Sequence, residues 1–366
     1  MARIGITGAS GFIGWHFRCR LFGLKEVETI MLDDAAFNDP EAMRSFVVSC
    51  DAIVHLAGMN RGEEDAIYET NVRLTQTLID ACEAANVRPH ILFASSTHRT
   101  RETAYGRSKK ESEVRLRAWS ERAGSSVTVM IFPNVFGEHG RPHYNSAVAT
   151  FCDQIYKHEP SEINREGMIE LVHVQEVAAH IVRFILERQT GEVRIQGTEI
   201  NVGELYDLLS SMMREYESGI VPRLDRPLRT ALFNTLRSFL PSDWAPKYPE
   251  KKTDERGWLF EAIKSENGGQ TFISKTNPGI TRGNHFHLRK VERFCVISGS
   301  AEIKLRRLFT DEIRVYRVDG EKPCWIDMPT LWTHNISNIG SSELITAFWS
   351  NEIFNPSDPD TFAHPV

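Results

Sequence analysis

The sequence has no apolar run that approaches the roughly 20 residues needed to cross a bilayer. It also lacks a basic block long enough to follow a nucleic-acid backbone, because 43 Lys and Arg residues are dispersed among 49 Asp and Glu residues and the net charge is -6. The chain enters an apolar segment at once, without the features of a signal peptide. We therefore expect a cytoplasmic protein with no membrane and no nucleic-acid partner.

Cysteine is scarce, and no two cysteines form a C-x-x-C pair. The six cysteines are scattered among mostly apolar neighbours: Cys19, Cys50, Cys82, Cys152, Cys295 and Cys324. This pattern favours reduced, buried thiols and argues against a disulfide framework or a zinc knuckle. The length of 366 residues exceeds that of one ordinary core and predicts two domains.

Glycine is concentrated near the start of the chain, where the motif T-G-A-S-G-F-I-G at residues 7–14 follows the apolar run 4–6. This order predicts a strand, a tight turn and a helix. Gly8 permits the turn, Gly11 lets a pyrophosphate approach the backbone, and Gly14 allows close packing of helix and strand. Such a triplet also occurs in turns that bind nothing, so the dinucleotide interpretation depends on the segments that follow.

Three further apolar segments, at residues 27–32, 51–58 and 90–97, are predicted to be buried parallel strands. The first ends in Asp33-Asp34, where a carboxylate either binds the ribose hydroxyls of the cofactor, which favours NADH, or is simply solvated. Asn71 opens a run with helical periodicity that Arg88-Pro89 ends.

Tyr105 and Lys109 form a Y-x-x-x-K pair at the start of a charged helix. Spacing of four places both side chains on one helix face. An ammonium beside a phenol favours the phenolate, so the tyrosine can act as an acid or a base nearer neutral pH. A hydroxyl of Ser95, Ser96 or Thr97 would hold a substrate carbonyl. An isolated pair of this kind is usually an ordinary surface pair, but here it follows the glycine turn, the strands and the hydroxyl cluster in order. The combination predicts hydride transfer at a carbonyl carbon.

These motifs resemble the extended short-chain dehydrogenase/reductase family, whose members mostly act on nucleotide-activated sugars. The resemblance covers residues 1–240 and implies a Rossmann-type α/β fold, a doubly wound parallel sheet. It implies that Ser96, Tyr105 and Lys109 are catalytic, and that Asn71 supports the active site. The loop 133–137 would begin the sugar pocket. The candidate cofactor-binding residues are Gly8, Gly11, Phe12, Ile13, Gly14, Asp33, Leu56, Ala57, Asn71, Tyr105 and Lys109.

Five prolines interrupt residues 221–249, which we interpret as a bridge between domains. Beyond Thr253, short runs rich in Phe, Ile, Val and Thr alternate with turn residues, as in a small sandwich or barrel. The expected domains are therefore residues 1–245 and 250–366.

The second domain contains the spacing G-x5-H-x-H-x4-E-x6-G at residues 279–299. His285 and His287 lie two apart, so on a strand both imidazoles point into the barrel. Glu292 can return on the neighbouring strand, and His334 can join from a later one. Three imidazoles and a carboxylate suit a divalent transition metal, zinc first, with manganese, iron and nickel also compatible.

This spacing resembles the first motif of the cupin family, which implies a small all-β jelly-roll barrel. The second motif matches less fully, because Leu331 stands where the family usually has glycine. Two alternatives to a catalytic metal stay open: a metal-free pocket that keeps the histidines as acid-base groups, and a metal that only stabilises the barrel.

The segments 144–152, 278–285, 333–336 and 351–356, together with the fusion of the two halves, resemble a group of bifunctional capsular-polysaccharide enzymes that act on a UDP-4-keto-6-deoxy-N-acetylhexosamine. The resemblance implies C3 epimerisation in the cupin half and NADPH-dependent reduction of the C4 ketone in the Rossmann half. The product would be UDP-2-acetamido-2,6-dideoxy-L-talose, a precursor of UDP-N-acetyl-L-fucosamine, made by a homodimer. Asp33 leaves NADH open, and the candidates for the epimerisation base are the His and Lys residues around 285–290 and Lys264.

Several other classes compete with this interpretation. A monofunctional nucleotide-sugar 4-ketoreductase or epimerase would carry a structural cupin, and a cupin dioxygenase would require iron. A dehydratase usually has an acidic pair beside the active-site hydroxyl, whereas Ser96 is followed by Thr97-His98-Arg99. A non-catalytic binding protein is expected to have lost Tyr105 or Lys109.

Overall fold

A computed structural model describes residues 2–24, 27–161, 163–250, 252–254, 257–260, 262–265 and 267–366. The chain divides into two compact units: Met1–Phe136 with Met168–Ile200, and Gly137–Gly167 with Asn201–Val366. The second unit therefore includes helical segments that precede the boundary near residue 245 expected from the sequence. Sequence composition could not show this, because those helices are amphipathic and could pack on either unit.

The first unit is built on six parallel strands in the order β2-β1-β3-β4-β5-β8. Their bounds are β2 Val27–Leu32, β1 Ala2–Thr7, β3 Ala52–His55, β4 His90–Ser96, β5 Val127–Phe132 and β8 Gly191–Arg194. The strand order reverses at β1, so the carboxyl ends of β1 and β3 border the crevice where such sheets bind ligands. This confirms the doubly wound parallel sheet.

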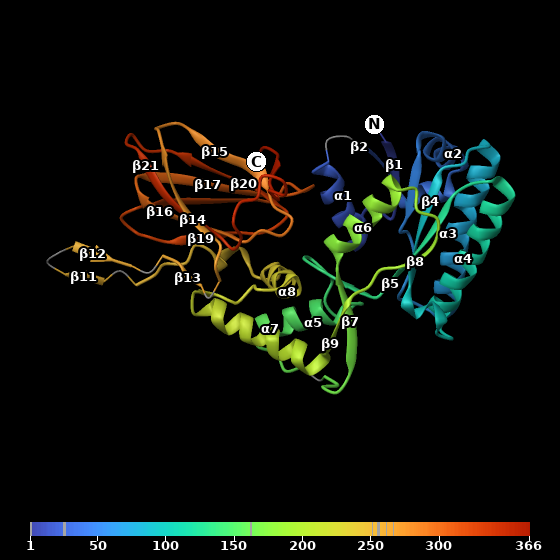
Figure 1. The fold of residues 1–366 in the computed structure, drawn as a ribbon, viewed down its shortest axis with the longest axis horizontal. Helices are drawn as coiled ribbons and strands as arrows, with labels where there is room; N and C mark the ends of the chain where they lie inside the picture. Colours follow the sequence, from blue (N-terminus) through green and yellow to red (C-terminus); the bar gives the residue numbers. More distant parts are fainter. Residues whose placement is uncertain are drawn as a thin grey trace. The chain divides into compact units, whose positions relative to one another are not determined.

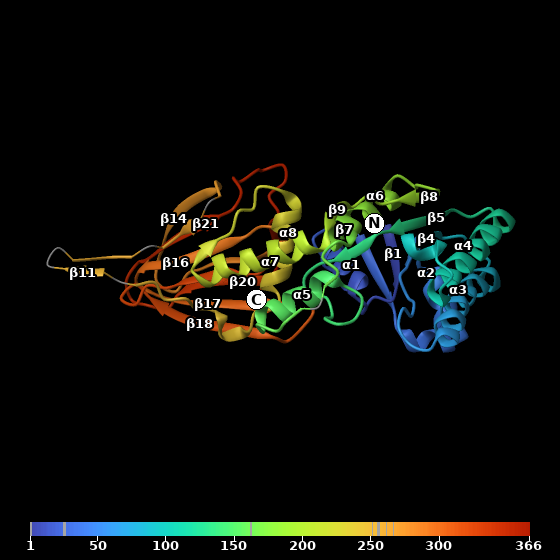
Figure 2. The same cartoon turned by 90° about the horizontal axis from the view of Figure 1, so that it is seen from below.

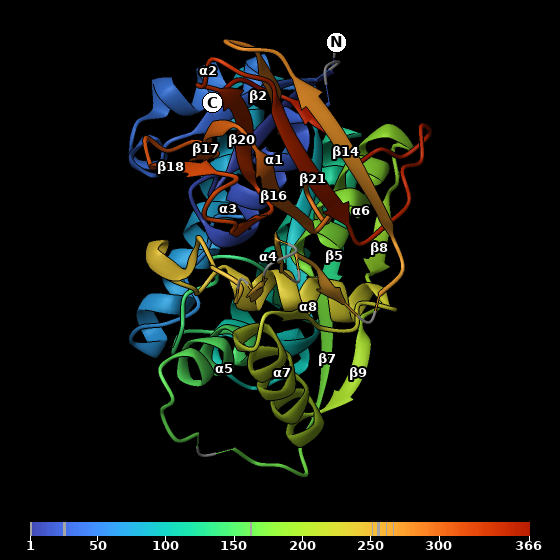
Figure 3. The same cartoon turned by 90° about the vertical axis from the view of Figure 1, so that its left-hand side faces the viewer.

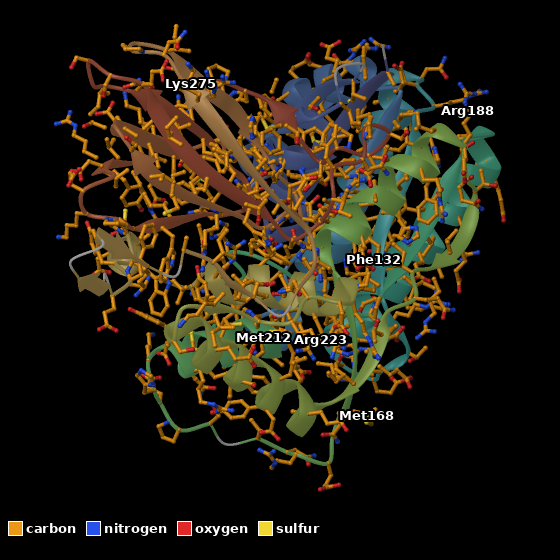
Figure 4. The ribbon with its side chains drawn as sticks, turned by 60° about the vertical axis from the view of Figure 1, so that its left-hand side comes forward. Phe132, Met168, Arg188, Met212, Arg223 and Lys275 are labelled. Carbon is orange, nitrogen blue, oxygen red and sulfur yellow. The ribbon has the colours of Figure 1, made fainter. Side chains whose placement is uncertain are left out.

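Helices cover both faces of this sheet (Figure 1). On one face lie α1 (Phe12–Phe22) and α6 (Val174–Leu186), and on the other lie α2 (Pro40–Ser49), α3 (Glu64–Ala85) and α4 (Ala104–Ala123). Helix α3 begins at Glu64 and not at Asn71, because acidic residues in its first turn favour an earlier start. A separate sheet in the order β6-β7-β9 comprises Asn134–Phe136, Met168–His173 and Thr198–Asn201. Phe132, labelled in Figure 4, is buried at the end of β5.

The helical part of the second unit consists of α5 (Ala147–Tyr156), α7 (Val202–Glu217) and α8 (Pro227–Arg237), which pack against one another (Figure 2). Met212 of α7 is buried (Figure 4). Pro227 occupies the first turn of α8, where a missing N–H costs nothing. One proline of the presumed bridge thus begins a helix.

Most of the remainder of the second unit forms a pair of antiparallel sheets (Figure 3). One has the order β14 (Gln270–Thr276), β21 (Leu344–Ser350), β16 (Glu292–Ser298) and β19 (Trp325–Met328). The other has the order β18 (Ile313–Asp319), β17 (Ser300–Arg307), β20 (Trp332–Asn338), β15 (Thr281–Phe286) and β22 (Phe362–Ala363). Their inner faces share one apolar core that includes Phe294, Ile303 and Phe348. This agrees with the expected small all-β cupin-like domain.

Short elements complete the described chain: β10 Ile220–Val221 pairs with β13 Lys264–Ser265, and β11 Lys252–Asp254 with β12 Gly257–Leu259. Three 3-10 turns span Asp34–Asn38 (η1), Thr97–Thr100 (η2) and Ser242–Trp244 (η3). All six cysteines are buried and unpaired with one another, as expected. Among the described helices, none combines the length and the apolar character needed to cross a membrane.

Candidate functional site

The three glycines of the first turn have different structural roles. Gly8 has φ +67°, and a Cβ there would lie 2.7 Å from the Ala57 nitrogen. A Cβ on Gly14 would lie 2.2 Å from the Gly8 carbonyl oxygen, so both positions exclude any side chain. At Gly11 the nearest such contact is 3.2 Å, again to Gly8 oxygen. In the described structure no side chain caps the start of α1 beside Gly11, so its first N–H groups are available to an anion such as a pyrophosphate.

The other cofactor candidates of the first strands lie at the same edge. Leu56 and Ala57 follow β3, and their N–H groups donate to the Thr7 carbonyl oxygen at 3.3 Å and to Thr7 Oγ1 at 3.2 Å. Phe12 begins α1 directly after the glycine turn. Asp33 is exposed at the end of β2, where its carboxylate accepts the Ala35 N–H at 2.8 Å. The residues present therefore fit a dinucleotide.

Tyr105 and Lys109 lie in the first two turns of α4, which is capped by Thr103 through a 3.1 Å hydrogen bond to the Gly106 N–H. Lys109 Nζ is 5.6 Å from the Tyr105 ring centroid and donates to the Ala94 carbonyl oxygen at 2.8 Å. The Ser96 hydroxyl, at the end of β4, is hydrogen-bonded to the Tyr105 phenol. The structure thus brings the three predicted catalytic side chains to one place.

The protonation states differ from the sequence-based expectation. Burial raises the pKa of Tyr105 to about 12, and the hydrogen bond from Ser96 only partly offsets this effect. Burial lowers the pKa of Lys109 to about 8, opposed by the nearby Glu113 carboxylate. The sequence analysis expected the ammonium to favour the phenolate; in the structure the Lys109 ammonium donates to the Ala94 carbonyl oxygen, and burial has the larger effect on the pKa of Tyr105. A protonated phenol is the form that can give a proton to a developing alkoxide.

Asn71 is buried and joins the segment after β3 to helix α4. Its Oδ1 accepts the Met59 N–H at 2.6 Å, and its Nδ2 donates to the Met59 carbonyl oxygen at 2.8 Å and to Ser108 Oγ at 3.0 Å. Because every polar atom of this amide is engaged, Asn71 holds neighbouring backbone in position.

Glu113 is a buried carboxylate that the sequence analysis missed. It accepts Ser95 Oγ at 2.5 Å and Arg99 Nη1 at 2.7 Å. Arg99 in turn contacts the Glu192 carboxylate through both terminal nitrogens, at 3.0 and 2.5 Å. Ser95 is thus bound to Glu113, whereas Ser96 faces Tyr105. The available signal was the spacing of four from Lys109, which places Glu113 one helical turn further on the buried face.

A second cluster lies in the all-β part of the other unit. One ligand atom each from His285, His287, Glu292 and His334 can be chosen so that all four lie within 4.8 Å of one another. His287 Nε2 is 2.9 Å and His334 Nε2 3.6 Å from Glu292 Oε2. Glu292 begins β16 in the four-stranded sheet, so it lies on the facing sheet and not on the strand next to His285. His334 does pair directly with His285 across β15 and β20.

The residues of this cluster fit a metal ion. The Nδ1 atoms of His334 and His287 are held by the carbonyl oxygens of Trp332, at 3.2 Å, and of Asp360. Such contacts orient the Nε2 atoms toward a common centre. His334 Nε2 is buried and has no hydrogen-bond partner among the described residues. Burial and the neighbouring histidines lower the pKa of His285 to about 3, so its ring is neutral and can act as a ligand.

Unusual backbone conformations place these ligands. The register of β15 against β20 shifts between Gly283 and His285, and Gly283 and Asn284 have φ values of +96° and +58°. A bulge of this kind re-aims the side chain that follows it. Leu331, at the usual glycine position, is fully buried with φ +66°, and its N–H donates to the His287 carbonyl oxygen at 2.8 Å.

Two lysines were further candidates for the base that removes the C3 proton. Lys290 Nζ donates to the Pro359 carbonyl oxygen at 2.7 Å, and Lys264 lies in β13, outside the two larger sheets. Sequence reasoning did not select Ser350, which lies opposite Glu292 in the register of β16 and β21. Its buried hydroxyl has no partner among the described residues, so it is available to a ligand near Glu292.

Comparison with known proteins gives matches to both halves and to the whole chain. Residues 4–203 match the NAD dependent epimerase/dehydratase family and residues 252–362 the polysaccharide biosynthesis C-terminal domain. The chain is 34% identical to a UDP-2-acetamido-2,6-beta-L-arabino-hexul-4-ose reductase of Pseudomonas aeruginosa, covering 100% of this chain and 99% of the relative. It matches the crystal structure of the capsular polysaccharide assembling protein CapF of Staphylococcus aureus at 33% identity, full coverage of both chains and a TM-score of 0.63. A Thermus thermophilus UDP-glucose 4-epimerase in complex with NAD, at 18% identity, covers 65% of this chain and 98% of its own with a TM-score of 0.54, a likeness of fold alone.

Proposed function

The chain belongs to the NAD dependent epimerase/dehydratase family and is similar to CapF over its whole length, and from this premise we propose that it is a bifunctional UDP-sugar enzyme of surface-polysaccharide biosynthesis. Its substrate is a UDP-4-keto-6-deoxy-N-acetylhexosamine. The all-β domain epimerises C3, and the Rossmann unit then reduces the C4 ketone with NAD(P)H. The product is UDP-2-acetamido-2,6-dideoxy-L-talose, a precursor of UDP-N-acetyl-L-fucosamine.

The observation that carries the proposal is the grouping of Ser96, Tyr105 and Lys109 beside the carboxyl ends of the parallel strands. A bound nicotinamide supplies a hydride to C4. The Ser96 hydroxyl binds the C4 oxygen, and the protonated Tyr105 phenol gives its proton to that oxygen as the alkoxide develops. The Lys109 ammonium stabilises the phenolate that remains. One hydride and one proton convert the ketone to a secondary alcohol.

The C3 step fits the histidine and carboxylate cluster. A C–H beside a ketone is acidic when the enolate is stabilised, so a proton can leave C3 on one face and return on the other. The residues that would hold a divalent ion, which we propose is Zn²⁺, are His285, His287, Glu292 and His334; such an ion supplies positive charge to an enolate oxygen. His285 is partly exposed whereas the other three are buried, so substrate approaches from its side.

Nuclear magnetic resonance of the keto sugar in deuterated water tests both steps. Before nicotinamide is added, we expect deuterium to enter C3. After NADPH or NADH is added, C4 reduction follows, and the ratio of the two rates gives the preferred cofactor. Tyr105→Phe should retain exchange and lose reduction, whereas His285→Ala should lose exchange.

The main alternative is a monofunctional 4-ketoreductase or epimerase with a structural all-β domain. Reduction without C3 exchange would select the reductase and refute the two-step proposal. No change in the sugar would reject the substrate class.

We also propose a homodimer. β14 is an edge strand that carries exposed apolar side chains, including Ile273 at 71% exposure, and such edges commonly pair. Lys275 of this strand is labelled in Figure 4. Light scattering that gives the mass of one chain would reject this assembly.

A further inference from the structure

The last residues of the chain return to the histidine cluster. Strand β22 (Phe362–Ala363) pairs with β15, so that Ala363 lies opposite His285 and Phe362 opposite Phe286. The His364 N–H also donates to the Asn284 carbonyl oxygen at 2.9 Å. The strand that carries the first histidine is therefore held along its outer edge by the end of the chain.

Asp360, just before this strand, engages the second histidine and the segment that follows it. The Asp360 carbonyl oxygen accepts the Nδ1 hydrogen of His287. The Asp360 carboxylate accepts three consecutive backbone N–H groups: Leu288 at 3.1 Å, Arg289 at 3.0 Å and Lys290 at 2.8 Å. One residue thereby contacts both the ring of His287 and the backbone between His287 and Glu292.

The burial and conformation of Asp360 indicate that this segment does more than cover the surface of the domain. Asp360 is 3% exposed, and its φ of +42° is a left-handed conformation that Asp and Asn tolerate better than most residues. A carboxylate that accepts several backbone N–H groups makes strong, charge-assisted hydrogen bonds. The carbonyl contact keeps a hydrogen on His287 Nδ1, so Nε2, which donates to Glu292 Oε2 at 2.9 Å, is the nitrogen that can give up its proton and bind a metal ion.

We propose that Asp360 is a positioning residue for the histidine cluster, and that segment 360–364 acts as a built-in clamp which aims His287 Nε2 and holds the segment leading to Glu292. The proposal deepens the proposed function, since the ring it aims is a ligand of the proposed metal ion. The clamp itself is a property of this chain's hydrogen bonds and is testable without metal.

The test compares Asp360→Asn with Asp358→Asn. Asparagine keeps the size of Asp360, its backbone carbonyl and its tolerance of positive φ, but loses the charge and replaces one acceptor oxygen by a donor. Asp358 is an exposed residue just before this segment whose carboxylate contacts only the Arg289 guanidinium among the described residues, at 3.0 to 3.1 Å. It therefore controls for a change of charge beside this segment. Thermal melting identifies any variant that fails to fold.

The first measurement is hydrogen exchange on the full-length, chelator-treated protein. We expect Asp360→Asn to speed exchange of the Leu288, Arg289 and Lys290 amides at least about tenfold, because their acceptor is weakened. Asp358→Asn should leave these rates within about twofold. Unchanged protection in folded Asp360→Asn would overturn the clamp.

The second measurement uses Co²⁺ as a probe of the cluster. We expect Asp360→Asn to weaken Co²⁺ binding about tenfold and to shift its visible absorption, because weaker carboxylate contacts to residues 288–290 loosen the residue whose carbonyl oxygen holds His287 Nδ1. Asp358→Asn should match the wild type in both. Wild-type affinity and spectrum in Asp360→Asn would overturn the positioning role. If the wild-type protein binds no Co²⁺, the proposed metal centre fails, while amide exchange still decides whether the clamp exists.

Discussion

The Ser95 hydroxyl donates a 2.5 Å hydrogen bond to the buried Glu113 carboxylate, which links the end of strand β4 to the helix that carries Tyr105 and Lys109. Glu113 lies one helical turn beyond Lys109 and raises the pKa of that amine, while burial lowers it to about 8. The end of strand β4 and Lys109, which we propose to be catalytic, therefore both interact with the carboxylate of Glu113.

This relationship predicts a pH dependence of C4 reduction. The Lys109 ammonium is present below its pKa of about 8 and is lost as the pH rises through that value, so the rate should fall above about pH 8. In Glu113→Gln the supporting charge is gone, so the fall should move to lower pH. Rates across pH at saturating substrate check this. Glu111→Gln, which breaks only a pair with Arg115 on the same helix, should keep the wild-type profile.

The lowered pKa of Lys109 also predicts how this residue contributes to stability at different pH values. Its pKa is lower in the folded protein than the ordinary value of 10.5, so between about pH 8 and 10.5 the unfolded chain binds more protons. The contribution of Lys109 to the free energy of unfolding should therefore rise with pH across this window. Urea unfolding of wild type and Lys109→Met at several pH values measures it, and equal pH slopes would contradict it.

Removing the Tyr105 hydroxyl should abolish most of the reduction. Tyr105→Phe loses the proton donor to the C4 oxygen, and general acid catalysis is worth about 10² to 10⁴ in rate. The measurement is nicotinamide oxidation in the presence of the keto sugar. Tyr248→Phe removes an exposed phenol elsewhere and should retain full activity. A Tyr105→Phe rate within a few-fold of wild type would show that another group gives the proton.

The carboxylate at Asp33 should control the choice of nicotinamide. Asp33→Ser keeps a side-chain acceptor for the Ala35 N–H but removes a negative charge that would repel a 2'-phosphate. We expect the ratio of kcat/KM for NADPH to that for NADH to rise about tenfold, which corresponds to about 1.4 kcal/mol. Asp34→Ser is the matched control. An unchanged ratio would mean that Asp33 is only a solvated helix cap.

Gly14 should tolerate no side chain. A Cβ there would lie 2.2 Å from the Gly8 oxygen and 2.9 Å from the Ala9 Cα, and both belong to backbone that cannot easily move. Gly14→Ala should lower the free energy of unfolding by at least about 1–3 kcal/mol, the usual cost of overpacking, and weaken nicotinamide binding. Denaturant unfolding and nicotinamide titration measure these effects. Gly268→Ala, where a Cβ meets no atom within 4 Å, should change neither.

Much of this molecule could be predicted locally. The strand, glycine turn and helix at residues 4–14, the parallel strands and the change to antiparallel strands after residue 253 depend on residue periodicity and turn residues, which act over a few positions. The spacing of Tyr105 and Lys109 and that of His285 and His287 likewise predict grouped side chains, because helices and strands have fixed repeats.

The tertiary structure determined the properties that depend on contacts between distant segments, namely protonation states and the partners of the reactive side chains. Burial, which no local pattern measures, keeps the Tyr105 phenol protonated, and the packing of β16 in the facing sheet sets the approach of Glu292 to the histidines. Asp360 reaches His287 across 73 positions because the end of the chain folds back as an added strand. The sequence by itself determined which reactive groups exist and their local spacing, whereas the fold determined their partners and protonation states, since both depend on solvent exclusion and long-range hydrogen bonds.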